Sequence, residues 1–110
     1  MNDREFDQCR TRLSDNLEEL VALLRENSEH DWADQLQLLG RGVAEPDALS
    51  LDRLMNAYNA AGSLNDLELT PARGHNIRDT DVGFVNQQLT RLRTLVWNDA
   101  KAMRRELRHR

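Results

Sequence analysis

The chain has 110 residues, of which 39% are hydrophobic and 31% are charged, and its formal net charge is −4. This length suits one compact domain with a small core. No apolar run approaches the roughly 20 residues that cross a bilayer, and the charged first residues lack the apolar segment of a secretory signal. The single cysteine, Cys9, forms no disulfide framework. We therefore expect a cytoplasmic protein without a membrane partner.

The charge is unevenly distributed along the sequence. Residues 1–66 contain 14 acidic and 6 basic residues, a net charge of −8, whereas residues 67–110 contain 5 acidic and 9 basic residues, a net charge of +4. Most of the chain would repel phosphate groups, which argues against a nucleic-acid partner. An acidic first half is instead suited to attract a cationic protein.

The first predicted element is a helix of roughly 23 residues that begins near Asp3 and ends at Asn27 and Ser28. Its apolar residues recur at steps of three and four, which is typical of one buried helix face. They are Phe6, Cys9, Leu13, Leu17, Leu20 and Leu24.

A second helix is predicted to follow at once. Ser28 and Asp31 have the spacing of a capping box, with Asp in place of the usual Glu, and Gly40 and Gly42 predict its end. Its apolar residues are Trp32, Leu36 and Leu39.

The position of Pro46 favours the first turn of a third helix, which Gly62 is expected to close. The apolar residues of this helix are Leu49, Leu51, Leu54, Met55 and Tyr58.

A long last helix is predicted after a cap at Asp79 or Thr80. Its apolar positions are Val82, Val85, Leu89, Leu92, Val96, Ala100, Met103 and Leu107. The basic tail, residues 101–110, suits the negative end of the helix dipole, and Arg104, Arg105 and Arg108 are also candidates to contact an acidic partner or the first helix. The pattern as a whole predicts an all-α, single-domain bundle over residues 1–110, with about four helices and a long ordered loop, about 61–78, before the last helix.

The loop is the main candidate for function, because a loop of this length is uncommon in a small domain and is often functional. Its leucines, at positions 64, 67 and 69, are expected to close the open end of the bundle, and residues 67–70 alternate as in an extended segment. Asn65 and Asp66 can hold a turn by bonding to nearby backbone amides, and Gly62 can adopt backbone angles that other residues avoid.

Catalysis and metal binding find little support in the sequence. An enzyme would use His75 with Asp66 or Glu68, but Ser63 lies in no nucleophile-elbow pattern and no oxyanion site accompanies it. His30 and Asp34 are four residues apart, which is too unspecific for a metal site. We expect no enzyme activity, no metal and no cofactor.

One set of residues resembles a family of short, uncharacterised bacterial proteins. In that family a Tyr precedes a Gly-Met-Gly-Ser-(Phe/Leu)-Asn-Asp-Leu segment. The matching positions here are Trp32, Tyr58, Gly62, Ser63, Leu64, Asn65, Asp66 and Leu67, and Ala60-Ala61 stand where the family usually has Gly-Met. The relatives of this family look like proteins that accompany bacterial toxins, so the resemblance implies an immunity protein.

The expected function is therefore binding and neutralising a cognate toxin by occluding its active site. The candidate partner-binding residues are Glu18, Glu19, Glu29, Asp31 and Asp34 in the first helices and Asn65, Asp66 and Glu68 in the loop. Two alternatives remain: a helical adaptor or regulator that forms a homodimer through its long helices, and a small enzyme or ligand-binding domain.

Overall fold

The computed structural model describes residues 1–59 and 62–110, which form four α-helices and three short 3₁₀ helices. The α-helices are α1 (Asp3–Glu26), α2 (His30–Gly42), α3 (Ala48–Asn56) and α4 (Val82–Arg108), and the 3₁₀ helices are η1 (Leu64–Asp66), η2 (Pro71–Arg73) and η3 (Asp79–Asp81). The predicted all-α bundle with a loop before the last helix is confirmed. No helix in these two ranges is long and apolar enough to cross a membrane.

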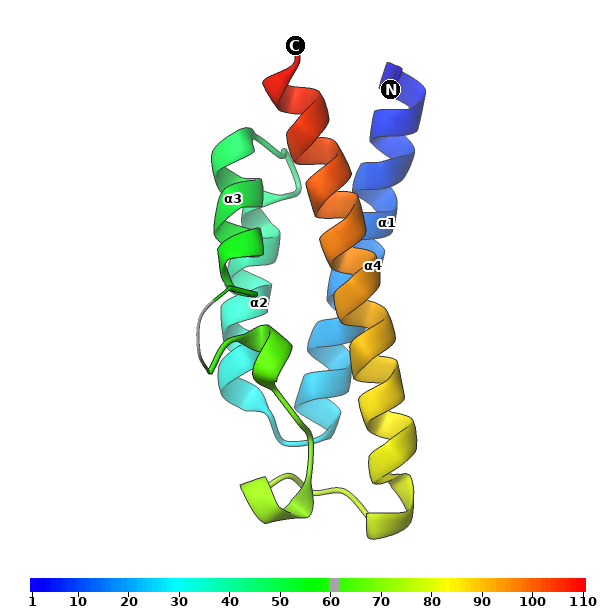
Figure 1. The fold of residues 1–110 in the computed structure, drawn as a ribbon, viewed down its shortest axis with the longest axis vertical. Helices are drawn as coiled ribbons and strands as arrows, with labels where there is room; N and C mark the ends of the chain where they lie inside the picture. The colour runs from blue at the N-terminus through cyan, green and yellow to red at the C-terminus, as the bar shows by residue number, and fades with distance from the viewer. Residues whose placement is uncertain (60–61) are drawn as a thin grey trace.

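The bundle is elongated, with extents of 47 × 24 × 18 Å. Helices α1 and α4 run antiparallel side by side, and α2 and α3 pack beside them, so that both chain termini lie at one end (Figure 1). Because α3 is short, it leaves the opposite end of the bundle uncovered, and the chain from 62 to 81 covers that end before α4 begins.

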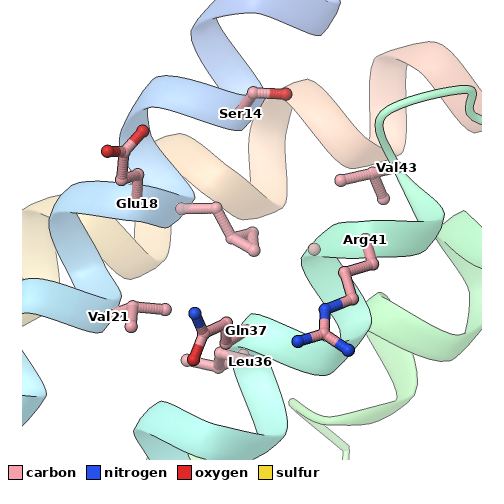
Figure 2. A pocket seen from close by; sticks show the side chains of 9 residues that line it. Ser14, Glu18, Val21, Leu36, Gln37, Arg41 and Val43 are labelled. Carbon is pink, nitrogen blue, oxygen red and sulfur yellow. The ribbon is translucent and has the colours of Figure 1, made fainter.

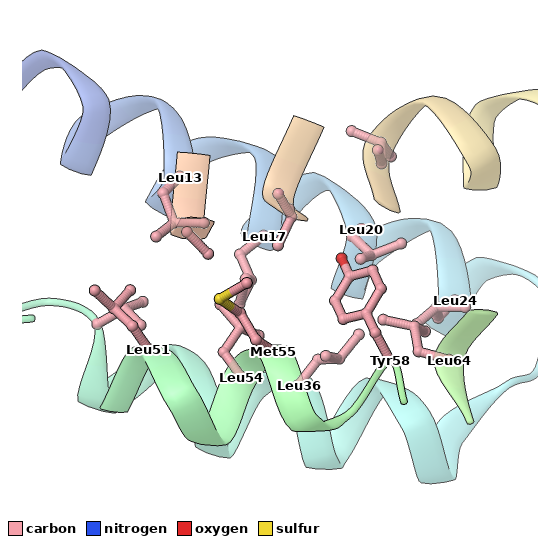
Figure 3. Packing of buried hydrophobic residues seen from close by; sticks show 14 of the residues in the cluster. Leu13, Leu17, Leu20, Leu24, Leu36, Leu51, Leu54, Met55, Tyr58 and Leu64 are labelled. Carbon is pink, nitrogen blue, oxygen red and sulfur yellow. The ribbon is translucent and has the colours of Figure 1, made fainter. Parts of the chain in front are cut away.

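The core is formed by the apolar faces that the periodicity predicts. Every predicted position of α1, from Phe6 to Leu24, is buried, and on α4 the buried positions run from Leu89 to Met103. Figure 3 shows the leucines of α1 facing Leu51, Leu54, Met55 and Tyr58. The long heptad-like faces of α1 and α4 are thus used against each other within one chain.

The connection between α1 and α2 differs from the predicted capping box. Ser28 adopts a left-handed conformation, with φ of 67°, and the backbone N–H of Glu29 donates to the carbonyl of Leu24 at 2.8 Å. This is a Schellman ending of α1. The N-cap of α2 is therefore Glu29, whose side chain accepts from the backbone N–H of Trp32 at 3.3 Å.

Gly40 is predicted to end α2 together with Gly42. The helix ends at Gly42, and Gly40 lies inside it. A β-carbon at this position would approach Cδ2 of Leu17 to 3.1 Å. Glycine is thus the residue that lets α2 lie this close to α1.

Two predictions for α3 are also wrong in detail. Its N-cap is Asp47, which forms a capping box with Ser50, so that Pro46 stands just outside the helix. Leu49 is 57% exposed, because it lies two residues, about 200° around the helix, from the buried Leu51. The helix ends at Asn56, six residues before Gly62.

The last helix begins later than predicted. Asp79 and Thr80 belong to the short helix η3, and Asp81 occupies the N-cap of α4 without a side-chain capping bond.

Candidate functional site

The segment that carries the family resemblance forms a tight turn at the end of α3. The carbonyl of Tyr58 accepts hydrogen bonds from the Ser63 hydroxyl at 3.0 Å and from the Asn65 side-chain amide at 3.2 Å. The Asp66 carboxylate accepts from the backbone N–H of Gly62 at 3.0 Å. Gly62 has φ of 73°, a conformation that other residues adopt only with strain. The polar residues of the motif thus hold the turn itself. Ala60 and Ala61, which replace the family's Gly-Met, lie outside the described residues.

Arg93 attaches this turn to α4. Its guanidinium donates to the carbonyls of Leu64 at 2.7 Å and Leu67 at 3.1 Å. In return the Tyr58 hydroxyl donates to the Arg93 carbonyl at 2.8 Å, and the Tyr58 ring packs on Trp97 with centroids 5.0 Å apart. Burial lowers the pKa of Arg93 and raises the pKa of Tyr58. The buried carbonyls of the turn are therefore satisfied by a charged donor, a strong form of hydrogen bond.

Asn86 of α4 attaches the extended part of the loop. Its side-chain oxygen accepts from the backbone N–H of Leu69 at 2.9 Å, and its side-chain nitrogen donates to the Leu69 carbonyl at 2.8 Å. The amide thus takes the place of a neighbouring β-strand. Leu64 and Leu69 are fully buried, and Leu67 is nearly so, which confirms that the loop leucines close the bundle.

Sequence reasoning missed both Asn86 and Arg93. The available signal was their spacing: Val82, Asn86, Leu89 and Arg93 follow one another at helical steps of four and three. A polar residue within an otherwise apolar helix face indicates a buried hydrogen-bonding partner.

His75 fixes the far end of the loop and is 7% exposed. Its Nδ1 lies 3.0 Å from the backbone nitrogen and 3.1 Å from the carbonyl oxygen of Thr70, and its Nε2 lies 3.1 Å from Oε1 of Glu29. Glu29 therefore joins α1, α2 and the loop at one corner.

The residues of the predicted enzyme alternative are separated by these contacts. The partner of His75 is Glu29, while Asp66 binds the Gly62 amide and Ser63 binds the Tyr58 carbonyl. In the described residues these groups form no shared hydrogen-bonded set. Nor does any cluster of three or more metal-ligating side chains occur in residues 1–59 and 62–110.

The second candidate region is a groove between α1 and α2, which we call the α1–α2 groove (Figure 2). It has a volume of about 280 Å³ and is lined by Ser14, Leu17, Glu18, Val21, Leu36, Gln37, Gly40, Arg41 and Val43. Glu18 and Arg41 stand on opposite sides of it. Beyond Gln37, Arg25 bridges the two helices through bonds to Gln37 at 2.6 Å and Asp34 at 2.8 Å.

The predicted partner-binding residues do not form one patch. Glu29 and Asp66 are engaged inside the molecule, as described above. Asp34 pairs with Arg25, and Glu19 lies 3.7 Å from Arg91 of α4. Glu18, Asp31 and Glu68 are exposed, and within the described ranges they have neither a hydrogen bond nor an ion pair through their side chains. Asn65 is exposed but bonded to the turn.

The basic tail is partly neutralised by its own fold. Arg104 and Arg108 both pair with Asp52 of α3, at 2.9 and 3.2 Å, and Arg110 pairs with Asp3 at 3.3 Å. Arg104 and Arg108 thus bind α3 and not the first helix, which was one of the partners expected for them, and within the described residues Arg105 has no ion pair. The contact of the tail with the first helix is made by Arg110 instead.

Comparison of the chain with protein-family models, curated proteins and solved structures gives no significant match.

Proposed function

We propose that this chain is an immunity-type protein, which binds a cognate bacterial toxin domain and blocks its active site. The sequence motif around Tyr58 and Asp66 suggests this class by resemblance. The proposal places the contact surface on α1 and α2 rather than on the loop, because the polar side chains of the loop motif are engaged within the loop.

The observation that carries the proposal is the acidic character of the α1 and α2 surface. Residues 3–42 contain ten acidic and five basic residues, a net charge of −5. Of these, Asp15, Glu18, Glu26 and Asp31 are exposed and, among the residues described, form no ion pair. Such an acidic surface attracts a cationic protein. Toxins that act on phosphate-containing substrates have a cationic active site, which an acidic surface would complement.

Electrostatic attraction of this kind acts mainly on the rate of association. Exposed charges are screened beyond about 10 Å at 0.1 M salt. We therefore expect association with the toxin to slow as salt rises, while dissociation depends less on salt because it is set by the desolvated centre of the interface.

The deciding experiment is protection of cells. The proposal predicts a toxin gene beside this one, and the lack of such a gene would count against it. Cells that express that toxin should survive with this protein and die without it, and the purified proteins should form a stable complex. Glu18→Lys should associate several-fold more slowly, and its combination with Asp31→Lys at least tenfold more slowly, whereas Glu68→Lys, a loop reversal matched in charge to Glu18→Lys, should leave the rate within twofold.

Three further outcomes would count against the proposal. They are death of the cells in the presence of the protein, a substrate turned over by the protein alone in a manner abolished by His75→Ala, and a concentration-dependent homodimer that does not bind the toxin. The second outcome would favour the enzyme alternative, and the third would favour the adaptor.

A further inference from the structure

The α1–α2 groove is one of several depressions on the described surface, and its lining comes from both α1 and α2. Gly40 of α2 lines it, and a β-carbon at this position would lie 3.1 Å from Cδ2 of Leu17. Leu17 and Leu36, which also line it, are at most 3% exposed. Val21 on α1 is only half-buried beside it. The apolar surface that the groove offers to solvent is therefore mainly that of Val21 and of the Gly40 backbone.

The two charges that border the groove differ in their consequences for a ligand. Glu18 extends from α1 and Arg41 from α2 (Figure 2), and in the described part of the chain neither forms an ion pair with the other or with a third residue. Arg25 and Asp34, farther along, neutralise each other at 2.8 Å. Outside the groove lining, the exposed Asp15 of α1 and Asp31 of α2 add negative charge to the surface of the same two helices.

We infer that the α1–α2 groove receives one large apolar side chain of a cationic protein segment, and that an arginine or lysine beside this side chain pairs with Glu18. This inference rests on the proposed function, since it identifies the part of the partner that the acidic surface recognises. The size is suitable: the groove measures about 280 Å³, and a cavity of about 150 Å³ in a protein core already holds a benzene molecule.

The energetic logic follows that of known interfaces. A few buried anchor residues provide most of the affinity, and surrounding charges select the partner. Here Val21 and the backbone at Gly40 offer the contact for the anchor, and Glu18 offers the charge. Arg41 repels a cationic partner and attracts an acidic one. Removal of its charge should therefore strengthen the binding of a cationic ligand and weaken the binding of an acidic ligand.

The inference can be tested without the toxin. The probe is a displayed library of random 12-residue peptides, selected on the full-length protein. The selected peptides should contain a large apolar residue flanked by arginine or lysine. The best peptide should bind at least tenfold more weakly to Val21→Phe, which fills the groove, and at least fivefold more weakly to Glu18→Gln. It should bind as well or better to Arg41→Gln.

Leu38→Phe is the matched control for Val21→Phe. Leu38 lies on the same pair of helices but is 64% exposed and outside the groove, so enlarging it should leave peptide binding within twofold. Helical circular dichroism and a melting curve show that each variant is folded. If Val21→Phe does not fold, a peptide chemical-shift map on the wild type serves instead: shifts centred on Val21 and Gly40 support the inference, and shifts elsewhere overturn it.

The inference is overturned if selection yields acidic peptides, if it yields none, or if binding survives in the folded Val21→Phe variant. Its failure is distinguishable from failure of the proposed function. Cells protected equally by wild type and by Val21→Phe would retain the immunity function and remove the groove from it, whereas groove-dependent peptides together with unprotected cells would retain the groove and remove the immunity function.

Discussion

The loop 62–78 and the α1–α2 surface are both rich in polar residues, but they use them differently. In the loop, Asp66, Asn65 and His75 bind backbone groups or a neighbouring side chain. On α1 and α2, Glu18 and Asp31 extend into solvent. The difference arises from the backbone: helix interiors satisfy their own N–H and C=O groups, whereas an irregular loop must find partners for them elsewhere.

This comparison teaches that polar residues in an irregular segment are weak evidence for a binding site until the backbone of that segment has been accounted for. The carbonyl of Leu67 and both backbone groups of Leu69 would lose these partners without Arg93 and Asn86, and the Leu64 carbonyl would keep only the bond from the Leu67 N–H. Loop polarity here serves folding, and the acidic helices remain available for a partner.

The largest expected difference between the two regions concerns leucine. Leu64 in the loop is fully buried, whereas Leu38 on α2 is 64% exposed. Leu64→Ala should lower the free energy of unfolding by about 2–5 kcal/mol, because it leaves a cavity, and Leu38→Ala should change it by no more than about 0.5 kcal/mol. Urea unfolding followed by circular dichroism measures both. Equal midpoints for the two variants would mean that the loop is not part of the core.

The next largest effect on stability is expected from a comparison of two arginines of α4, Arg93 and Arg91. Arg93→Ala removes the donor to the Leu64 and Leu67 carbonyls and should cost about 2 kcal/mol, since hydrogen bonds to charged groups exceed neutral ones. Arg91→Ala removes only a pair with Glu19, 3.7 Å long and exposed on both sides, and should cost less than about 1 kcal/mol. Hydrogen exchange at Leu67 and Leu69 should speed up in the first variant alone; unchanged exchange there would contradict the described role of Arg93.

A smaller effect is expected from the acidic residues of the loop. Asp66→Ala removes the acceptor for the Gly62 N–H and should cost about 1 kcal/mol. Glu68 is exposed, and Glu68→Ala should stay within about 0.5 kcal/mol. Chemical denaturation of the two variants in parallel gives the comparison. A loss of stability in Glu68→Ala as large as that in Asp66→Ala would refute the account of the turn.

The last prediction concerns pH and the face of α1 that packs against α4. Cys9 faces α4, is 1% exposed and lies 3.3 Å from the Asp99 carboxylate. Burial, reinforced by Asp99, raises the pKa of the Cys9 thiol from 9.0 to about 11. In the unfolded chain the thiol ionises near pH 9, while the folded protein keeps its proton. The stabilisation is therefore complete below pH 9 and is lost as pH rises through 11.

The urea midpoint of the wild type should accordingly fall more between pH 8 and pH 10.5 than that of Cys9→Ala, in which the thiol is missing. Thiol reagents at pH 8 should label Cys9 only after denaturant is added. Rapid labelling of the native protein would contradict the burial of Cys9 against α4.

The sequence alone determined the helices and the buried faces, because apolar residues that recur with the helical period of 3.6 residues mark the face of a helix that is buried. Each predicted position from Phe6 to Leu24 is buried, and so are the central positions of α4. The burial of Leu64, Leu67 and Leu69 was also predictable, as was the turn held by Asn65 and Asp66, because leucines need cover and short polar side chains bind nearby backbone.

The tertiary structure decided what depends on residues distant in the sequence. His75 binds Glu29, 46 residues away, and Arg93 binds carbonyls at Leu64 and Leu67, 29 and 26 residues away. No local pattern specifies such partners, since they depend on how α4 is placed against the loop. The α1–α2 groove has the same origin, because its lining residues come from two helices and its shape depends on how α1 and α2 pack in the folded chain.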